Sequence, residues 1–166
     1  MRIAQLAPLA ESVPPKLYGG TERVVAWLVD ELVKLGHDVT LFASGDSRTT
    51  GKLHPVWPRA LRLGRKGADP GAANAMLLEA IAKRARDFDV IHAHIDWLQL
   101  PLLSRLGVPF MTTMHGRLAW VARTGSAIPR GWFRVDLRSS ASAASGCEVD
   151  GNDPARIAVG AVAPLL

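Results

Sequence analysis

The chain has 166 residues, of which 48% are hydrophobic and 21% charged, with a formal net charge of +5 and a single cysteine. This length suits one domain with a sizeable core, and the apolar fraction excludes intrinsic disorder. The sequence has one cysteine, no recognisable cleavage site for a leader and no apolar run of transmembrane length. We therefore expect a cytoplasmic protein without a transmembrane segment. The basic residues are scattered and lack interleaved aromatic residues, so we expect no nucleic-acid partner.

Four apolar runs are typical of buried strands, and they lie at residues 2–7, 38–43, 88–93 and 108–113. Helical spacing of apolar residues predicts helices over residues 22–35 and 72–86, and a shorter segment over 97–106 that a proline interrupts. Alternating strands and helices with uniformly apolar strands predict an α/β fold, a Rossmann-like parallel sheet with helices on both faces.

The first predicted helix has recognisable ends. Thr21 is placed to act as its N-cap and Gly36 to follow its last residue in the left-handed conformation. The chain over residues 53–71 contains several Pro and Gly residues, and no element is predicted there.

Ligands of a parallel sheet bind beyond the carboxyl ends of its strands. After the first strand, Gly19 and Gly20 open a helix, so the backbone can approach a ligand closely and free N–H groups favour an anionic group. The alternative is a loop that only needs glycine for its own conformation. The dinucleotide fingerprint G-x-G-x-x-G is missing, so the sequence gives NAD binding no support.

The third strand ends in the sequence HAHID, which contains His92, His94 and Asp96. Residues two apart on a strand face the same way, so both imidazoles are expected to meet one ligand. Two hypotheses follow: a polar edge that binds an acceptor, or a metallohydrolase site in which His115 completes the ligands. His92 alone is also compatible with a structural role in the core.

The fourth strand ends in TTMHG, with His115 and Gly116 at its carboxyl end. We expect the imidazole of His115 to face the same crevice as Gly19 and Gly20, where it would donate a hydrogen bond to a substrate hydroxyl or a transition state. A turn histidine that packs on the following helix is the alternative.

Three segments in this order, YGGTERVVAWLVDELVKLGHDVTLFASGDS, DVIHAHIDW and TTMHG, resemble the N-terminal half of glycosyltransferase family 4. The resemblance covers roughly residues 1–117. It implies one half of a GT-B fold and a retaining, metal-independent enzyme without a cofactor, which transfers a sugar from a nucleotide-sugar donor to a glycan or other hydroxyl acceptor.

The resemblance also implies roles for individual residues. Gly19, Gly20 and Thr21 would lie beside the donor diphosphate, and His94 and Asp96 would line the acceptor side. His115, followed by Gly116, would contact the transferred sugar near the reaction centre and is the candidate catalytic residue. The family's second domain carries most nucleotide contacts and is expected to be missing, so the chain is expected to be inactive alone, or to act as a sugar- or anion-binding module that a separate C-terminal domain completes.

Residues 118–166 lack the periodicity of helices or strands, and residues 139–146 are a Ser/Ala tract. One interpretation is an irregular, flexible tail. The other is a shifted reading frame, because codons compatible with residues 135–139 and 154–158, read one base on, give SISD and QHGLP, which resemble the family's sequences. In that case the segment was never selected to pack, and the nucleotide sequence tests the hypothesis.

Overall fold

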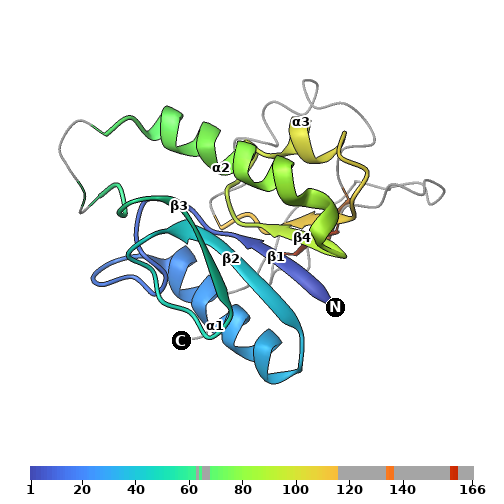
Figure 1. The fold of residues 1–166 in the computed structure, drawn as a ribbon, viewed down its shortest axis with the longest axis horizontal. Helices are drawn as coiled ribbons and strands as arrows, with labels where there is room; N and C mark the ends of the chain where they lie inside the picture. Colours follow the sequence, from blue (N-terminus) through green and yellow to red (C-terminus); the bar gives the residue numbers. More distant parts are fainter. Residues whose placement is uncertain (63, 65–67, 116–133, 137–157, 161–166) are drawn as a thin grey trace, which may run out of the picture.

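The computed structural model describes residues 1–62, 64, 68–115, 134–136 and 158–160. Its centre is a five-stranded sheet in the order β3-β2-β1-β4-β5, with every neighbouring pair parallel (Figure 1). The strands are β1 (Arg2–Leu6), β2 (Asp38–Ser44), β3 (Lys52–Trp57), β4 (Val90–Ala93) and β5 (Phe110–Thr112). The predicted parallel α/β fold is confirmed.

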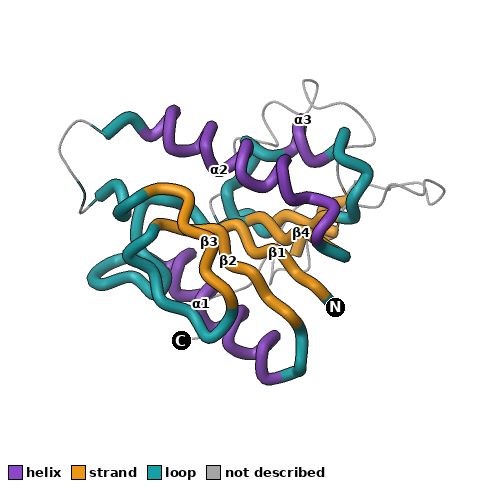
Figure 2. Tube along the Cα trace, in the orientation of Figure 1, coloured by secondary structure: helices purple, strands orange, loops and turns teal. Residues whose placement is uncertain are grey.

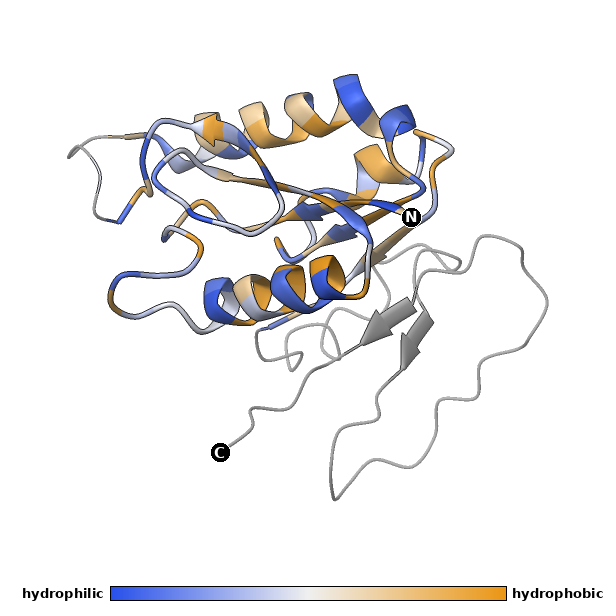
Figure 3. Ribbon diagram, turned by 60° about the horizontal axis from the view of Figure 1, so that its bottom comes forward, coloured by the Kyte–Doolittle hydropathy of each residue, from blue (hydrophilic) through white to orange (hydrophobic). Residues whose placement is uncertain are grey.

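Helices cover both faces of the sheet, as predicted (Figures 2 and 3). On one face α1 (Gly20–Lys34) packs Val25 and Val29 against the odd-numbered residues of β1 and β2. On the other face α2 (Pro70–Arg84), the short 3₁₀ helix η1 (Ala85–Asp87) and α3 (Leu100–Leu103) pack against the even-numbered residues. Strand side chains alternate between faces, so each face has its own apolar core.

The sequence predicts the end of α1 correctly but not its start. Gly36 has a φ of 83° and donates its N–H to the carbonyl of Val33, so the predicted left-handed end is confirmed. The prediction that Thr21 caps the start is wrong: Gly19 is the N-cap, and Thr21 lies within the first turn. The helix begins early because the carbonyl of Gly19 already accepts the N–H of Arg23.

The segment without a predicted element contains a strand. β3 pairs with β2 at the edge of the sheet, and Pro55 lies within it. A proline is compatible with an edge strand because one side of that strand needs no ladder hydrogen bonds. α2 begins at Pro70, two residues earlier than predicted. Asp69, the residue before it, caps the helix because its side chain accepts the N–H of Gly71, and a proline suits the first helical position.

The segment over residues 97–106 forms only the four-residue helix α3. In the predicted tail, the structure describes β6 (Arg134–Asp136) and β7 (Ala158–Gly160), which pair in parallel. The remainder of residues 118–166 lies outside the described residues, as does Gly116. Of the helices in the described part, none is long and apolar enough to cross a bilayer.

Candidate active site

The strand order places a crevice at the carboxyl ends of β1 and β4. The chain leaves β1 through α1 toward β2 on one side, whereas β4 and β5 extend the sheet on the other side. In open α/β sheets, such a reversal of strand order leaves a gap where ligands bind. Gln5 and His92 are register partners across β1 and β4, so their side chains share the α1 face of the sheet.

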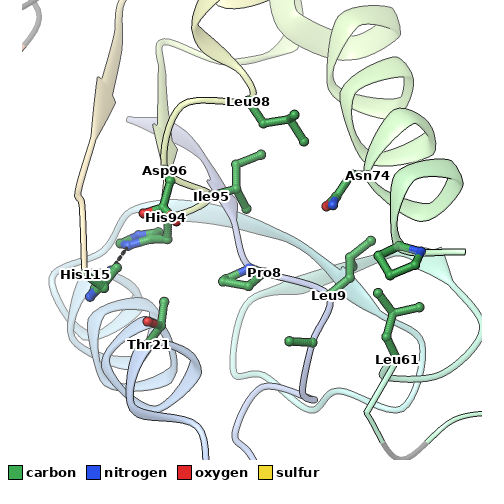
Figure 4. Close-up of a pocket in the computed structure, with 12 residues that line it drawn as sticks. Pro8, Leu9, Thr21, Leu61, Asn74, His94, Ile95, Asp96, Leu98 and His115 are labelled. Atoms are coloured by element: carbon green, nitrogen blue, oxygen red, sulfur yellow. Dashed lines mark hydrogen bonds between the residues drawn. The ribbon is translucent and has the colours of Figure 1, made fainter. Parts of the chain in front are cut away.

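A cleft of about 450 Å³ opens at this position. Four residues predicted from the sequence line it together: Thr21 at the start of α1, His94 and Asp96 after β4, and His115 after β5 (Figure 4). Gly19 and Gly20 precede Thr21 in the chain but are not among the residues that line the cleft. The crevice inferred from the strand ends is therefore present, with the glycine pair beside it.

Hydrogen bonds join the histidines of this region into one chain. His115 Nε2 lies 2.9 Å from His94 Nδ1, and His94 Nε2 lies 2.9 Å from Oε1 of Gln5. The amide Nε2 of Gln5 lies 3.4 Å from His92 Nδ1, and His92 Nε2 lies 2.7 Å from the hydroxyl of Thr113. Gln5 stands at the centre of this chain and is fully buried in β1. Sequence reasoning missed it, although a single polar residue in an apolar strand was a visible signal.

The amide of Gln5 sets the direction of the whole chain. Its carbonyl oxygen can only accept, so Nε2 of His94 carries a proton and donates it. Neutral His94 then accepts at Nδ1, which requires His115 to donate from Nε2. On the other side the amide nitrogen donates to Nδ1 of His92. Rotating this one amide by half a turn would reverse every donor and acceptor.

Burial keeps the inner histidines neutral. Removal from water, with a smaller contribution from His115, lowers the pKa of His92 to about 4. The pKa of His94 falls to about 2, for the same reason and because two other imidazoles adjoin it. His115 is half-buried; burial lowers its pKa as well, and the carboxylate of Asp96 acts in the opposite direction. All three rings are therefore uncharged near neutral pH.

The chemistry available to His115 follows from this arrangement. Its Nε2 proton is committed to His94, and within the described part of the chain the lone pair on Nδ1 has no hydrogen-bond partner, so it can accept a hydrogen bond from a hydroxyl. Donation to a substrate stays a prediction from the sequence, and in the tautomer that Gln5 favours the ring also offers Nδ1 as an acceptor. A hydroxyl hydrogen bonded to Nδ1 becomes a better nucleophile or is held in place for a neighbouring reaction.

A second buried amide connects the two loops that carry these side chains. Gln99 Nε2 donates both to the backbone carbonyl of Asp96 and to the hydroxyl of Thr112 in β5. Asp96 has a φ of 56°, a left-handed conformation that Asp tolerates better than most residues. Gln99 therefore ties the loop after β4 to the end of β5, and sequence reasoning did not single it out.

The two glycines have different structural reasons for being glycine. A Cβ on Gly19 would lie 2.7 Å from the Cβ of Pro15, so this position has no room for a side chain. A Cβ on Gly20 would meet nothing within 4 Å. Packing within the chain thus accounts for Gly19, whereas Gly20 leaves an open backbone surface at the start of α1, as close approach of a ligand would require.

The donor set does not suit the metallohydrolase hypothesis. Both ring nitrogens of His94 are engaged in hydrogen bonds, and the Nε2 of His115 points at His94 instead of sharing a ligand with it. Among the residues that the structure describes, no three His, Cys, Asp or Glu side chains come together as a metal site would need. A zinc ligand needs a free ring nitrogen, which His94 does not offer here.

The match to a family model shows the family of the chain. The family model described as Glycosyltransferase Family 4 matches residues 18–147, which runs past the boundary at residue 117 that the sequence suggests. No curated protein matches the chain.

Two solved structures that resemble the chain are a glycosyltransferase, AviGT4, involved in avilamycin A biosynthesis, and a sucrose-phosphate synthase from Thermosynechococcus elongatus. AviGT4 is 28% identical with a TM-score of 0.49, over 69% of this chain and 32% of its own. The synthase is 15% identical with a TM-score of 0.53, over 75% of this chain and 35% of its own. The chain thus spans about a third of the length of these structures, and by the match over residues 18–147 it belongs to glycosyltransferase family 4.

Proposed function

We propose that this chain forms the acceptor side of a sugar-transfer site, in which a nucleotide-sugar donor gives its sugar to a hydroxyl acceptor. One observation carries the proposal: Thr21, His94, Asp96 and His115, from three separate segments, line one cleft at the carboxyl edge of the sheet. Family membership makes sugar transfer the activity to expect there.

The proposal assigns each group a task. His115 accepts a hydrogen bond at Nδ1 from a hydroxyl of the transferred sugar or the acceptor, and His94 holds its ring through Nε2. The open backbone at Gly20 and the first turn of α1 receive the donor diphosphate, since free N–H groups there favour negative charge. No metal is needed for these tasks, and transfer with retention of configuration is part of the proposal.

A second domain that carries most nucleotide contacts completes the cleft in this proposal. A site open on one side does not exclude water, so the 166-residue chain alone is predicted to transfer little sugar. A location in the cytoplasm stays a prediction from the sequence.

Titration of the ¹⁵N-labelled chain with UDP-glucose and GDP-mannose tests the proposal. We expect amide shifts at Thr21 and at His115, weakened by His115→Ala and unchanged by the control His37→Ala, since His37 lies at the opposite edge of the sheet beside the N-terminal amine. Addition of the C-terminal domain of a family member, with mass spectrometry of the products, tests transfer. The proposal fails if neither sugar nucleotide shifts those residues and no transfer follows.

A further inference from the structure

The cleft of the candidate site has two chemically different ends. Thr21, His94, Asp96 and His115 gather at one end, and the lining continues with four apolar side chains, from Ile95 beside Asp96, past Leu98, to Leu9 and Leu61 at the opposite end (Figure 4). We call these four side chains the apolar arm. It is formed by the loop after β1, the segment after β3 and the loop after β4, which the fold brings to one edge of the sheet.

The backbone around the apolar arm offers little to a polar ligand. The carbonyls of Leu9 and Ala10 already accept the N–H groups of Leu61 and Arg62. Pro8 and Pro70, which also line the cleft, have no N–H to donate. These main-chain groups of the described residues are therefore not free to bind a polar ligand in the arm.

The start of α2 faces the same end of the cleft but does not favour an anion. The carboxylate of Asp69 accepts the N–H of Gly71, and the carbonyl of Asp69 accepts the N–H of Ala73. The negative charge of Asp69 also opposes a second negative group there. Of the described residues that line this end, Asn74 is the one with a polar side chain.

A sugar does not fit the chemistry of the arm. Each buried hydroxyl without a hydrogen-bond partner costs about 1–3 kcal/mol, and a hexose carries several hydroxyls against one side-chain amide. An alkyl chain, in contrast, gains free energy as the leucine and isoleucine side chains exclude water from it. The volume of the whole cleft, about 450 Å³, is in the range that holds a ligand of moderate size.

We propose that the acceptor is an amphipathic alcohol, whose hydroxyl reaches His115 at the polar end of the cleft and whose apolar carbon skeleton lies along the apolar arm. The inference rests on the proposed function, because it names the acceptor of that reaction. It separates the two acceptor classes left open by the sequence, and it selects the alcohol with an apolar skeleton over the glycan.

Straight-chain primary alcohols from butanol to octanol are the probes, with maltose as the polar comparison. Binding to the full 166-residue chain is followed by the methyl resonances of Leu61, Ile95 and Leu98. We expect the affinity to rise about fourfold for each added methylene that the arm buries, and maltose to leave these methyls unshifted. A series whose affinity does not depend on chain length, or maltose binding at these methyls, would overturn the proposal.

Leu98 offers a variant with a matched control. It is 47% exposed, and Met76 on α2 is 50% exposed but does not line the cleft. Leu98→Gln is expected to weaken octanol binding about tenfold, and Met76→Gln to leave it unchanged. Equal effects of the two variants would contradict the proposal. The shifts at Thr21 and His115 with sugar nucleotides are read separately, so loss of the proposed function and loss of the apolar arm are distinguishable.

Discussion

The central sheet has an amino-terminal edge, where its strands begin, and a carboxyl edge, where they end, and these two edges hold their polar groups in opposite ways. At the amino-terminal edge, Arg2 pairs with Asp89 at 2.8 Å and Lys52 pairs with Asp38 at 2.8 Å, with all four side chains well exposed. At the carboxyl edge, Gln5, His92 and His94 are buried and uncharged, and hydrogen bonds join them into a chain.

The difference between the edges has an energetic basis. Exposed ion pairs contribute little because water screens them and long side chains lose entropy, whereas a buried polar group that loses its partner carries the full cost of desolvation. The carboxyl edge therefore keeps groups that are costly to leave unsatisfied, next to the cleft. The predictions below test this contrast between a sensitive and a tolerant edge.

The largest effect is expected for Gln5→Leu. This change leaves Nε2 of His94 and Nδ1 of His92 without partners in a buried site, which should lower the free energy of unfolding by about 2–5 kcal/mol. Urea denaturation measures the loss. The ring-nitrogen shifts of His94 and His115 should also change, because the direction of the hydrogen-bond chain is no longer fixed.

Gln5→Glu separates the hydrogen-bonding role from packing. The carboxylate has the shape of the amide and still accepts from His94, and His92 can turn its proton toward it. This variant should be more stable than Gln5→Leu and should raise the pKa of His92 and His94, because a negative charge favours imidazolium. Equal losses of stability in both variants, with unchanged histidine pKa values, would show that Gln5 acts through packing alone.

The next largest effect is expected from acid, which should destabilise the carboxyl edge. Both inner histidines titrate near pH 6.5 when unfolded, but their pKa values in the folded chain are about 4 and about 2. Below pH 6.5 the unfolded state binds more protons, so stability is complete above that pH and falls as the pH drops. The expected slope is about 1.4 kcal/mol per pH unit for each histidine, until its folded pKa is reached.

The acid effect is measured by urea denaturation at a series of pH values between 7 and 4.5. His92→Asn should reduce the slope by about 1.4 kcal/mol per pH unit, the contribution of this one histidine. A stability that stays level from pH 7 to pH 5 would contradict the burial of neutral imidazoles at this edge.

Substitution of the two glycines should have smaller effects, on stability at Gly19 and on ligand binding at Gly20. Gly19→Ala forces a Cβ against Pro15 and should cost about 1–3 kcal/mol of stability. Gly20→Ala meets open space in the first turn of a helix and should leave stability within about 0.5 kcal/mol, while weakening UDP-glucose binding about tenfold. Unchanged UDP-glucose binding in Gly20→Ala would remove the donor diphosphate from this position.

The sequence predicts the apolar strands of the sheet because their short runs consist mostly of residues that favour burial. The runs that became β1, β2 and β4 are largely apolar on both faces, as suits strands between two helical layers, and the run of β5 is apolar although this strand ends the described sheet. β3 has mixed burial and a proline, since an edge strand needs neither a uniform apolar pattern nor a complete ladder. It therefore has no sequence signal that distinguishes it from a loop.

The candidate site, too, could be predicted from the sequence only in part. That His94 and His115 lie near each other follows from the rule that parallel strands end at one edge, and the structure places their rings in hydrogen-bond contact. Gln5 and the proton positions do not follow from any pattern. They depend on distances of about 3 Å between side chains from different strands, and on the orientation of one amide.

The smallest effect is expected at the amino-terminal edge. Asp89 accepts the backbone N–H of Arg2 at one oxygen and the guanidinium at the other, so Asp89→Asn can keep the backbone hydrogen bond but loses the charge and the hydrogen bonds from the guanidinium. The urea midpoint of Asp89→Asn should match that of the parent chain, and Asp89→Ala should fall slightly below it. Added salt should remove any remaining difference between Asn and the parent, because it screens exposed charges. If Asp89→Asn instead lowered the midpoint as far as Gln5→Leu, burial would not be what distinguishes the two edges, and the sensitivity of the cleft would need another cause.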